Sequence, residues 1–329
     1  MKKNKEAIFT ISLDFELYWG MRDKSSIEQY SKNLDGVEEA ITQLLKTFTQ
    51  NSIHATWATV GFLFYDVENL KNSFPNKLPQ YKNSNLSPYS YIERNSHLEK
   101  KYHSAQEIIK NISNDKNQEI ATHTFSHYYC LEEGQSKEEF YADIQQAIKT
   151  IKEETGEKTY SLVFPRNQWK EEYLSVLSKL DILSYRGTEK SWIYDPKNEE
   201  NNFILKRAVK LLDTYINISG HNTYSLDELK ANTPFNIPAS RFLRPVSKKL
   251  SFLEGMKLNR IKNSMTHAAK NRELFHLWWH PHNFGVDLES NLEFLNKILE
   301  HYKYLNKKYN MKSLNMKEVS LQLRGKNES

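Results

Sequence analysis

Two histidines four residues apart, His123 and His127, are the first residues of this sequence that suggest chemistry. They lie in ATHTFSHYYC, residues 121–130. A helix or a tight turn places positions i and i+4 on one side of the backbone, so both imidazoles can point at one spot. Neutral imidazole nitrogens are common ligands of zinc and similar divalent metals. Two unrelated structural histidines would give the same pair, so the pair needs support from the rest of the chain.

That support comes from polar residues that directly follow four predicted strands. Ligands of parallel α/β folds bind at the carboxyl ends of the strands, so these side chains are expected to meet at one edge. In an extended segment the two acids, which are two residues apart, face the same way. The predicted strands and the residues after them are 7–13 with Asp14 and Glu16, 119–122 with His123 and His127, 160–164 with Arg166 and Asn167, and 273–279 with His280 and His282.

The elements that must position these residues alternate between strands and helices. Further strands are predicted at 53–60 and 182–185, and helices at 35–50, 140–154 and 288–302. This alternation predicts an α/β fold with a parallel sheet or barrel. Residues 1–329 are interpreted as one catalytic domain with long insertions at 66–103 and 186–246. The second insertion contains strand-like pieces such as FILKRAV, and we expect both insertions to shape a substrate site.

The composition of the chain bears on the cellular location of the protein. The chain of 329 residues is 38% hydrophobic and 26% charged, with a mean hydropathy of −0.74. It has no apolar run of transmembrane length, and its start, MKKNKEAIFTISLDFE, lacks the apolar core of a secretory signal. A single cysteine, Cys130, excludes an internal disulfide framework and suits a reducing compartment. These features predict a cytoplasmic protein.

The charge pattern argues against nucleic acid as a partner. The net charge of +5 is mild, and no Lys/Arg-rich block or nucleic-acid-binding motif is present. The most basic stretch, residues 247–273, has helical apolar spacing and is interpreted as an amphipathic helix with a basic outer face. Such a face is usually only solvated. The alternative is a patch that attracts the phosphates of a linked substrate, or that makes weak contact with an anionic membrane surface.

The motifs together resemble the polysaccharide deacetylase family, carbohydrate esterase family four, from about Ala7 to Met316. The segments that carry the resemblance are the acids at 14 and 16, HTFSH at 123–127, FPRNQ at 164–168 and HLWWH at 276–280. The resemblance implies a deformed parallel (β/α) barrel. Many members have two adjacent aspartates, whereas this chain has Asp14-Phe15-Glu16, so the second acid has moved by one residue.

The resemblance also implies a role for each residue. Asp14 is expected to act as general base and His280 as general acid, with Arg166 as the charge partner of Asp14. A backbone N–H near Asn167 is expected to stabilise the oxyanion, and His282 and Trp19 are candidate substrate contacts. The expected metal ligands are Glu16, His123 and His127, although the roles of the two acids can be exchanged. Zinc is the default metal for these ligands, and cobalt, nickel or iron would also suit them.

The expected function is that of a metal-dependent hydrolase that removes an N-acyl group, specifically N-acetyl, from an amino sugar. The lack of an export signal suggests an intracellular intermediate of surface polysaccharide biosynthesis as the N-acylated substrate, either a free sugar or a conjugate. Two alternatives remain open. One is hydrolysis of another C–N amide bond, in an N-formyl sugar or a cyclic ureide. The other is a catalytically silent relative that binds carbohydrate. The sequence indicates no oligomeric state.

Overall fold

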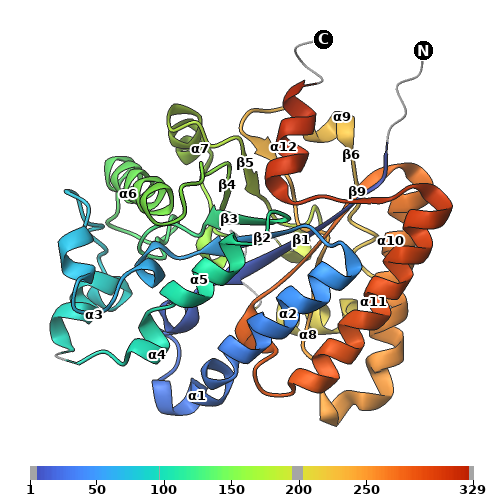
Figure 1. Ribbon diagram of the computed structural model, residues 1–329, viewed down its shortest axis with the longest axis horizontal. Coiled ribbons are helices and arrows are strands. Elements are labelled where there is room, and N and C mark those ends of the chain that lie inside the picture. Colours follow the sequence, from blue (N-terminus) through green and yellow to red (C-terminus); the bar gives the residue numbers. More distant parts are fainter. Residues whose placement is uncertain (1–5, 96, 195–202, 326–329) are drawn as a thin grey trace.

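A computed structural model describes residues 6–95, 97–194 and 203–325 of the chain (Figure 1). Its centre is a ten-stranded sheet in the order β6-β9-β1-β2-β3-β4-β5-β7, with β10 paired to β1 and β8 paired to β9. The strands are β1 (Ile8–Phe15), β2 (Ala55–Thr59), β3 (Gln118–Thr122), β4 (Ser161–Val163), β5 (Ser184–Arg186), β6 (Tyr224–Ser225), β7 (Phe235–Asn236), β8 (Arg241–Phe242), β9 (Glu273–Trp279) and β10 (Lys312–Ser313).

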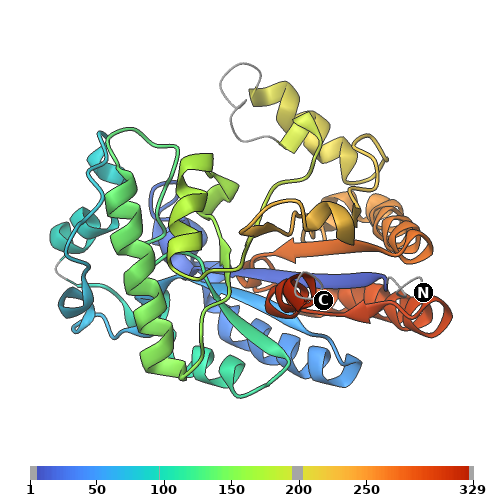
Figure 2. The same cartoon turned by 90° about the horizontal axis from the view of Figure 1, so that it is seen from above.

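Helices alternate with these strands and cover the outside of the curled sheet (Figures 1 and 2). They are α1 (Ile27–Asp35), α2 (Val37–Asn51), α3 (Pro88–Arg94), α4 (Lys100–His103), α5 (Gln106–Ser113), α6 (Lys137–Thr155), α7 (Glu171–Lys179), α8 (Phe203–Asp213), α9 (Leu226–Leu229), α10 (Glu254–Asn271), α11 (Leu288–Tyr309) and α12 (Met316–Gly325). Every strand pair is parallel except β6 with β9, which confirms the predicted α/β fold of the deformed parallel barrel type.

One extended segment, residues 235–243, lies between β5 and β9 and bonds to both. Near its start, the Ile237 N–H donates to the Tyr185 carbonyl oxygen, 2.9 Å away, on the β5 side. Farther along, the Ser240 N–H donates to the His276 carbonyl oxygen, 2.8 Å away, on β9. The same piece of chain therefore satisfies backbone groups of both neighbours and brings β5 close to β9.

The core explains why β1 lies at the centre. All eight residues of this strand are buried, as expected for a parallel strand covered on both faces. The apolar face of α2, which includes Ile41, Leu44 and Phe48, packs into the largest hydrophobic cluster together with residues of α10 and α11. Helix α2 ends in a left-handed residue, Ser52, whose N–H bonds back to the last turn.

The structure changes the expectation for two segments and adds detail to a third. FILKRAV is helical, within α8, rather than strand-like; its apolar residues continue at Leu211 and Leu212, a spacing that suits one side of a helix. The basic stretch 247–273 begins as a 3₁₀ helix, η8 (Lys248–Leu253), and becomes α-helical only in α10. The 66–103 insertion contains α3 and α4, and the interpretation as one domain with two insertions stays a prediction.

None of the helices that the structure describes combines the length and the apolar character that a membrane crossing requires.

Candidate metal centre and active site

Glu16, His123 and His127 converge at the carboxyl ends of β1 and β3. The Glu16 Oε2 atom lies 3.0 Å from His127 Nε2 and 3.3 Å from His123 Nε2. One ligand atom from each of the three residues falls within 4.8 Å of the others, and all three residues are buried. One carboxylate and two imidazoles at this spacing could hold a divalent metal ion.

The partners of the two imidazoles suit metal binding. His123 Nδ1 lies 2.9 Å from the Val163 carbonyl oxygen, which accepts its N–H and leaves the lone pair on Nε2, facing Glu16. His123 Nε2 and His127 Nδ1 have no hydrogen-bond partner among the described residues, although both are buried. Burial lowers the pKa of His127 to about 4, despite its hydrogen bond to Glu16, and so favours the neutral form that a ligand requires. These residues therefore fit a metal ion.

Space for the Glu16 carboxylate depends on a glycine. Glu16 follows β1 and begins the 3₁₀ helix η1 (Leu17–Gly20). A Cβ atom at Gly20 would lie 2.0 Å from Cδ and Oε1 of Glu16. Burial opposes ionisation of Glu16, but His280, His123 and His127 hold the pKa of this carboxyl well below its usual range. The carboxylate is therefore negative where it meets the two imidazoles.

Asp143 of α6 holds the loop between the two histidines. Its carboxylate accepts hydrogen bonds from the backbone N–H groups of Phe125, at 2.7 Å, and Ser126, at 3.1 Å, and from the Ser126 hydroxyl. Asp143 is fully buried, so these bonds replace those that water would otherwise make. Sequence reasoning missed this residue because α6 was assigned only a packing role.

Left-handed backbone occurs in both loops that border the site. Thr124 has φ 64° and His127 has φ 58°, while Arg166 and Asn167 have φ 56° and 53°. Non-glycine residues in this region cost energy that the surrounding structure must offset, and they gather at functional sites. Within this loop His127, four residues after His123, reaches Glu16 at the end of β1, with Nε2 3.0 Å from Oε2.

The second acid, Asp14, lies beside this group and forms a buried ion pair with Arg186. Arg186 Nη1 is 2.6 Å from Asp14 Oδ1, and Nη2 is 2.7 Å from Oδ2. Burial raises the pKa of Asp14, but Arg186 and, less strongly, His123 overcome that effect, so the net direction is down. Arg186 also lies over the Trp278 ring, 4.2 Å from its centroid.

The expected pairing of Arg166 with Asp14 is therefore corrected. Arg166 forms ion pairs with Asp23 and Glu132, and it stacks over the Tyr129 ring at 4.0 Å. Its left-handed backbone turns the side chain toward the rim of the site rather than toward β1. Arg186 ends β5, so the rule that polar residues follow the strands could have found it.

A chain of hydrogen bonds extends from this ion pair to β9. Ser12 Oγ accepts from Arg186 Nη1 at 2.9 Å and lies 2.8 Å from His276 Nε2. His276 Nδ1 faces the Ile237 carbonyl oxygen, 3.1 Å away. Burial, and then Arg186, lower the pKa of His276 to about 3. A neutral His276 can donate from Nδ1 and accept from the Ser12 hydroxyl, which fixes Arg186 in turn.

His280 faces both acids from the end of β9. Its Nε2 atom is 3.6 Å from Glu16 Oε1 and 3.9 Å from Asp14 Oδ2. Its side chain is 23% exposed, so a bound molecule could reach it. His282 stacks on it, with ring centroids 4.9 Å apart, and is itself buried; burial, and then His280, lower the pKa of His282 to about 3. The structure thus brings His280 to the two acids, with His282 packed behind it.

Two other expected contacts are corrected. The Asn167 N–H donates to the Phe164 carbonyl oxygen at 2.9 Å, so it is not available as an oxyanion donor. The Asn167 side chain instead accepts from Arg186 Nη2 at 2.9 Å. Trp19 is fully buried and donates its indole N–H to the His103 carbonyl oxygen, so it packs beneath the site and does not face substrate.

The sequence matches one known family over part of its length. Residues 35–184 match the model of the polysaccharide deacetylase family, which confirms the resemblance seen in the motifs. This match includes His123, His127 and Arg166, while β1 and β9 lie outside it. No curated protein matches the sequence closely enough to count as a relative.

Solved structures confirm the fold. A protein from Mycobacterium smegmatis, provisionally described as a polysaccharide deacetylase, is 11% identical, with a TM-score of 0.61 over 99% of this chain and 93% of that one. A Pseudomonas aeruginosa protein with the same provisional description is 9% identical, with a TM-score of 0.56 over 98% and 92%. An allantoinase is 10% identical, with a TM-score of 0.55 over 98% and 91%.

Proposed function

We propose that this chain, whose residues 35–184 match the model of the polysaccharide deacetylase family, is a metal-dependent hydrolase that removes an N-acyl group, specifically N-acetyl, from an amino sugar. The family match supports a deacetylase-type hydrolase. The observation that carries the finer proposal is the position of Glu16 Oε2, 3.0 and 3.3 Å from two imidazole nitrogens, with a separately held acid and a partly exposed histidine beside it.

Glu16, His123 and His127 would hold the metal. A bound divalent ion supplies a water of lowered pKa and polarises the acyl carbonyl. The geometry supports Glu16 as the ligand acid, because both imidazoles face its Oε2 atom, whereas both Asp14 oxygens face Arg186. Zinc is the first choice for this ligand set, and cobalt, nickel or iron remain options.

Asp14 would act as the general base. The bidentate contact with Arg186 keeps it ionised and fixes its orientation. A carboxylate has about four lone-pair sites, so Asp14 can still accept a proton from water. In the reaction, Asp14 takes a proton as the water oxygen bonds to the amide carbon. The C–N bond then breaks, and the leaving amine takes a proton from His280, giving a free amine and a carboxylic acid.

Metal analysis combined with an activity assay tests this proposal. The purified protein should contain divalent metal and hydrolyse at least one member of a panel of N-acetylated amino sugars, and a chelator should abolish the activity reversibly. His123→Ala or His127→Ala should lower bound metal and rate together. His54→Ala is a matched control, because His54 pairs with Glu318 and lies outside the site. Full activity in metal-free protein would end the metalloenzyme proposal.

The structural similarity to an allantoinase is a reason to test the second candidate reaction, hydrolysis of a C–N amide bond other than that of an N-acetyl sugar. The panel should therefore include a cyclic ureide and an N-formyl sugar. Hydrolysis of either one in place of N-acetyl sugars would keep the residue roles and change the substrate class. Binding of sugars with no hydrolysis of any compound would favour a silent carbohydrate-binding protein.

The cytoplasmic location and the intracellular substrate also stay proposals. The basic stretch 247–273 forms part of the surface through η8 and α10. Two of its apolar side chains are exposed there, Phe252 at 77% and Met256 at 43%. If this surface holds the protein weakly at a membrane, high salt should release it, since screening weakens attraction between exposed charges. Recovery of a processed form of the protein outside the cell would contradict the proposal that its substrate is intracellular.

A further inference from the structure

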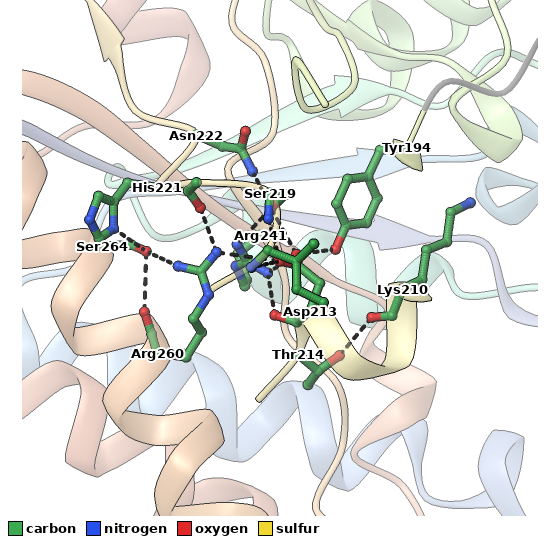
Figure 3. Close-up of polar contacts among 12 residues, drawn as sticks. Tyr194, Lys210, Asp213, Thr214, Ser219, His221, Asn222, Arg241, Arg260 and Ser264 are labelled. Carbon is green, nitrogen blue, oxygen red and sulfur yellow. Dashed lines mark hydrogen bonds and ion pairs between the residues drawn. The ribbon is translucent and has the colours of Figure 1, made fainter. Parts of the chain in front are cut away.

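A cluster of three arginines surrounds the turn that follows α8. Arg241 and Arg260 are both buried and converge on Asp213, the last residue of α8 (Figure 3). Arg241 Nη1 is 2.7 Å and Arg260 Nη2 is 3.6 Å from the Asp213 carboxylate. A third arginine, Arg244, approaches the same turn and donates from Nε to Thr214 Oγ1 at 3.0 Å.

Asp213 carries one negative charge, already faces Arg241 and Arg260, and forms no ion pair with Arg244 in the part of the chain that the structure describes. Its carboxylate accepts five hydrogen bonds, from the Tyr194 hydroxyl, the Ile218 N–H, the N–H and hydroxyl of Ser219, and Arg241. That number already exceeds the roughly four lone-pair sites of a carboxylate. Figure 3 shows Tyr194, Ser219 and Arg241 gathered around this side chain.

Two other acids in this region, Glu254 and Glu189, lie beside cations other than Arg244. Glu254 pairs with Lys257 at 2.6 Å, and buried Glu189 lies near Arg241 and Arg186. Among the described residues, no carboxylate forms an ion pair with Arg244, which is only partly exposed. Burial lowers the pKa of Arg244, as expected for a cation that has lost water without gaining an anion.

The strand register brings Arg244 to the candidate active site. Arg241 pairs with Leu277 and Phe242 with Trp278, and the Leu243 N–H donates to the Trp278 carbonyl oxygen. Arg244 directly follows Leu243, the last residue of this segment that bonds to β9, and His280 directly follows β9. Phe242 and Arg244 are two residues apart along this segment, so their side chains can lie side by side, while Arg241 and Arg244 both reach the turn that holds Asp213 and Thr214.

The Phe242 ring lies between the Arg244 guanidinium and His280, the proposed general acid. The Phe242 centroid is 4.7 Å from that of Trp278 and 6.0 Å from that of His280. The Arg244 guanidinium carbon is 5.8 Å from the same Phe242 ring. A substrate whose amide lies at His280 and whose body extends over Phe242 would therefore bring its next substituent to Arg244.

We propose that Arg244 binds a phosphate ester on the amino sugar and so selects phosphorylated or phosphate-linked substrates. This inference rests on the proposed function. The planar fork of arginine matches the geometry of a phosphate, and a partly buried guanidinium without an acid is ready to accept one. Neither the family match nor the solved structures assign a role to this position.

The test compares one N-acetylated amino sugar in three forms: neutral, as a phosphomonoester and as a phosphodiester with a short alkyl chain. The wild-type protein should prefer a phosphorylated form by roughly 10- to 100-fold in kcat/KM, the value of one charged hydrogen-bonded contact. Arg244→Gln should lose that preference mainly through KM, because the contact is made before and during the reaction. A preference for the diester over the monoester would indicate a linked substrate.

Two further variants serve as controls. Arg244→Lys should keep part of the preference, since it retains the charge and loses the fork. Arg272→Gln makes the same charge change at an exposed residue that precedes β9, at the opposite end of the strand, and should behave as wild type. A melting temperature for each variant separates lost binding from lost folding.

Equal kcat/KM for the neutral and phosphorylated sugars, or an unchanged preference in Arg244→Gln, would overturn the inference and leave the proposed function standing. If no sugar is hydrolysed, the proposed function fails, and calorimetric titration with inorganic phosphate still decides the inference. Phosphate should bind the wild-type protein and Arg272→Gln at least tenfold more tightly than Arg244→Gln. Equal affinities would refute a phosphate site at Arg244.

Discussion

Replacing Arg186 with methionine measures what the buried ion pair contributes to the site. Arg186 is fully buried and donates to both oxygens of Asp14, at 2.6 and 2.7 Å. Methionine keeps a flexible apolar stem, although a shorter one, and removes the charge. In the variant, Asp14 would stay buried with no cation in contact, while Ser12 Oγ and Asn167 Oδ1 would each lose a donor.

Removing one partner of a buried pair costs about 3–5 kcal/mol of unfolding free energy, because it leaves an uncompensated charge. At about 2.1 cal/mol/K per residue, unfolding 329 residues has an entropy of about 0.7 kcal/mol/K, so 1 kcal/mol corresponds to about 1.4 °C in melting temperature and the expected fall is about 4–7 °C. The double variant Arg186→Met with Asp14→Asn should be more stable than Arg186→Met alone, because it buries no unpaired charge.

Thermal denaturation of the metal-free proteins provides the measurement, so that metal binding does not contribute. Arg166→Met is the matched control: the Arg166 side chain is 18% exposed and pairs with Asp23 and Glu132 at the rim, so its loss should be smaller. A melting temperature for Arg186→Met within about 2 °C of wild type, or no recovery in the double variant, would refute the reasoning.

The remaining predictions concern the two acids, the glycine beneath Glu16, and Asp213. Asp14→Asn should lower hydrolysis by roughly 10²–10⁴-fold with metal content retained, whereas Glu16→Gln should lose metal on dialysis; the opposite pattern would exchange their roles. Gly20→Ala should reduce metal retention with little change in melting temperature, because the new Cβ displaces the Glu16 carboxylate; normal metal content would contradict this. Burial opposes ionisation of Asp213, but Arg241 and the hydrogen bonds lower its pKa from 3.8 to about 2, so its contribution to stability is present above about pH 4 and is lost as the pH falls toward 2. The melting temperature of wild type should therefore exceed that of Asp213→Asn at neutral pH, and the difference should shrink between pH 4 and 2.

Local patterns in the sequence were sufficient to predict the long strands and the polar residues at their ends. Parallel strands bring their carboxyl ends to one edge whatever the details of packing, so a residue directly after a strand is placed by sequence alone. This is why Glu16, His123, His127 and His280 are found close together. The helices α2, α6 and α11 were predicted from apolar spacing for the same reason, since periodicity is a local property.

The two-residue strands could not be predicted. Strands β7 and β8 are too short to show any periodicity, and their place is fixed by backbone bonds to β5 and β9, which are distant in sequence. FILKRAV shows the same limit in another form. A short apolar run suits either a strand or one side of a helix, and only its surroundings decide between them.

The partner of Asp14 was decided by tertiary structure alone. Arg166 and Arg186 each lie at the end of a neighbouring strand, β4 and β5, so the sequence gives no reason to prefer Arg186. The left-handed backbone of Arg166 directs its guanidinium to Asp23, while Arg186 continues its strand and points inward. The sequence determined which chemical groups reach the site. Side-chain direction, which depends on backbone angles and on contacts between distant segments, decided which of them pair.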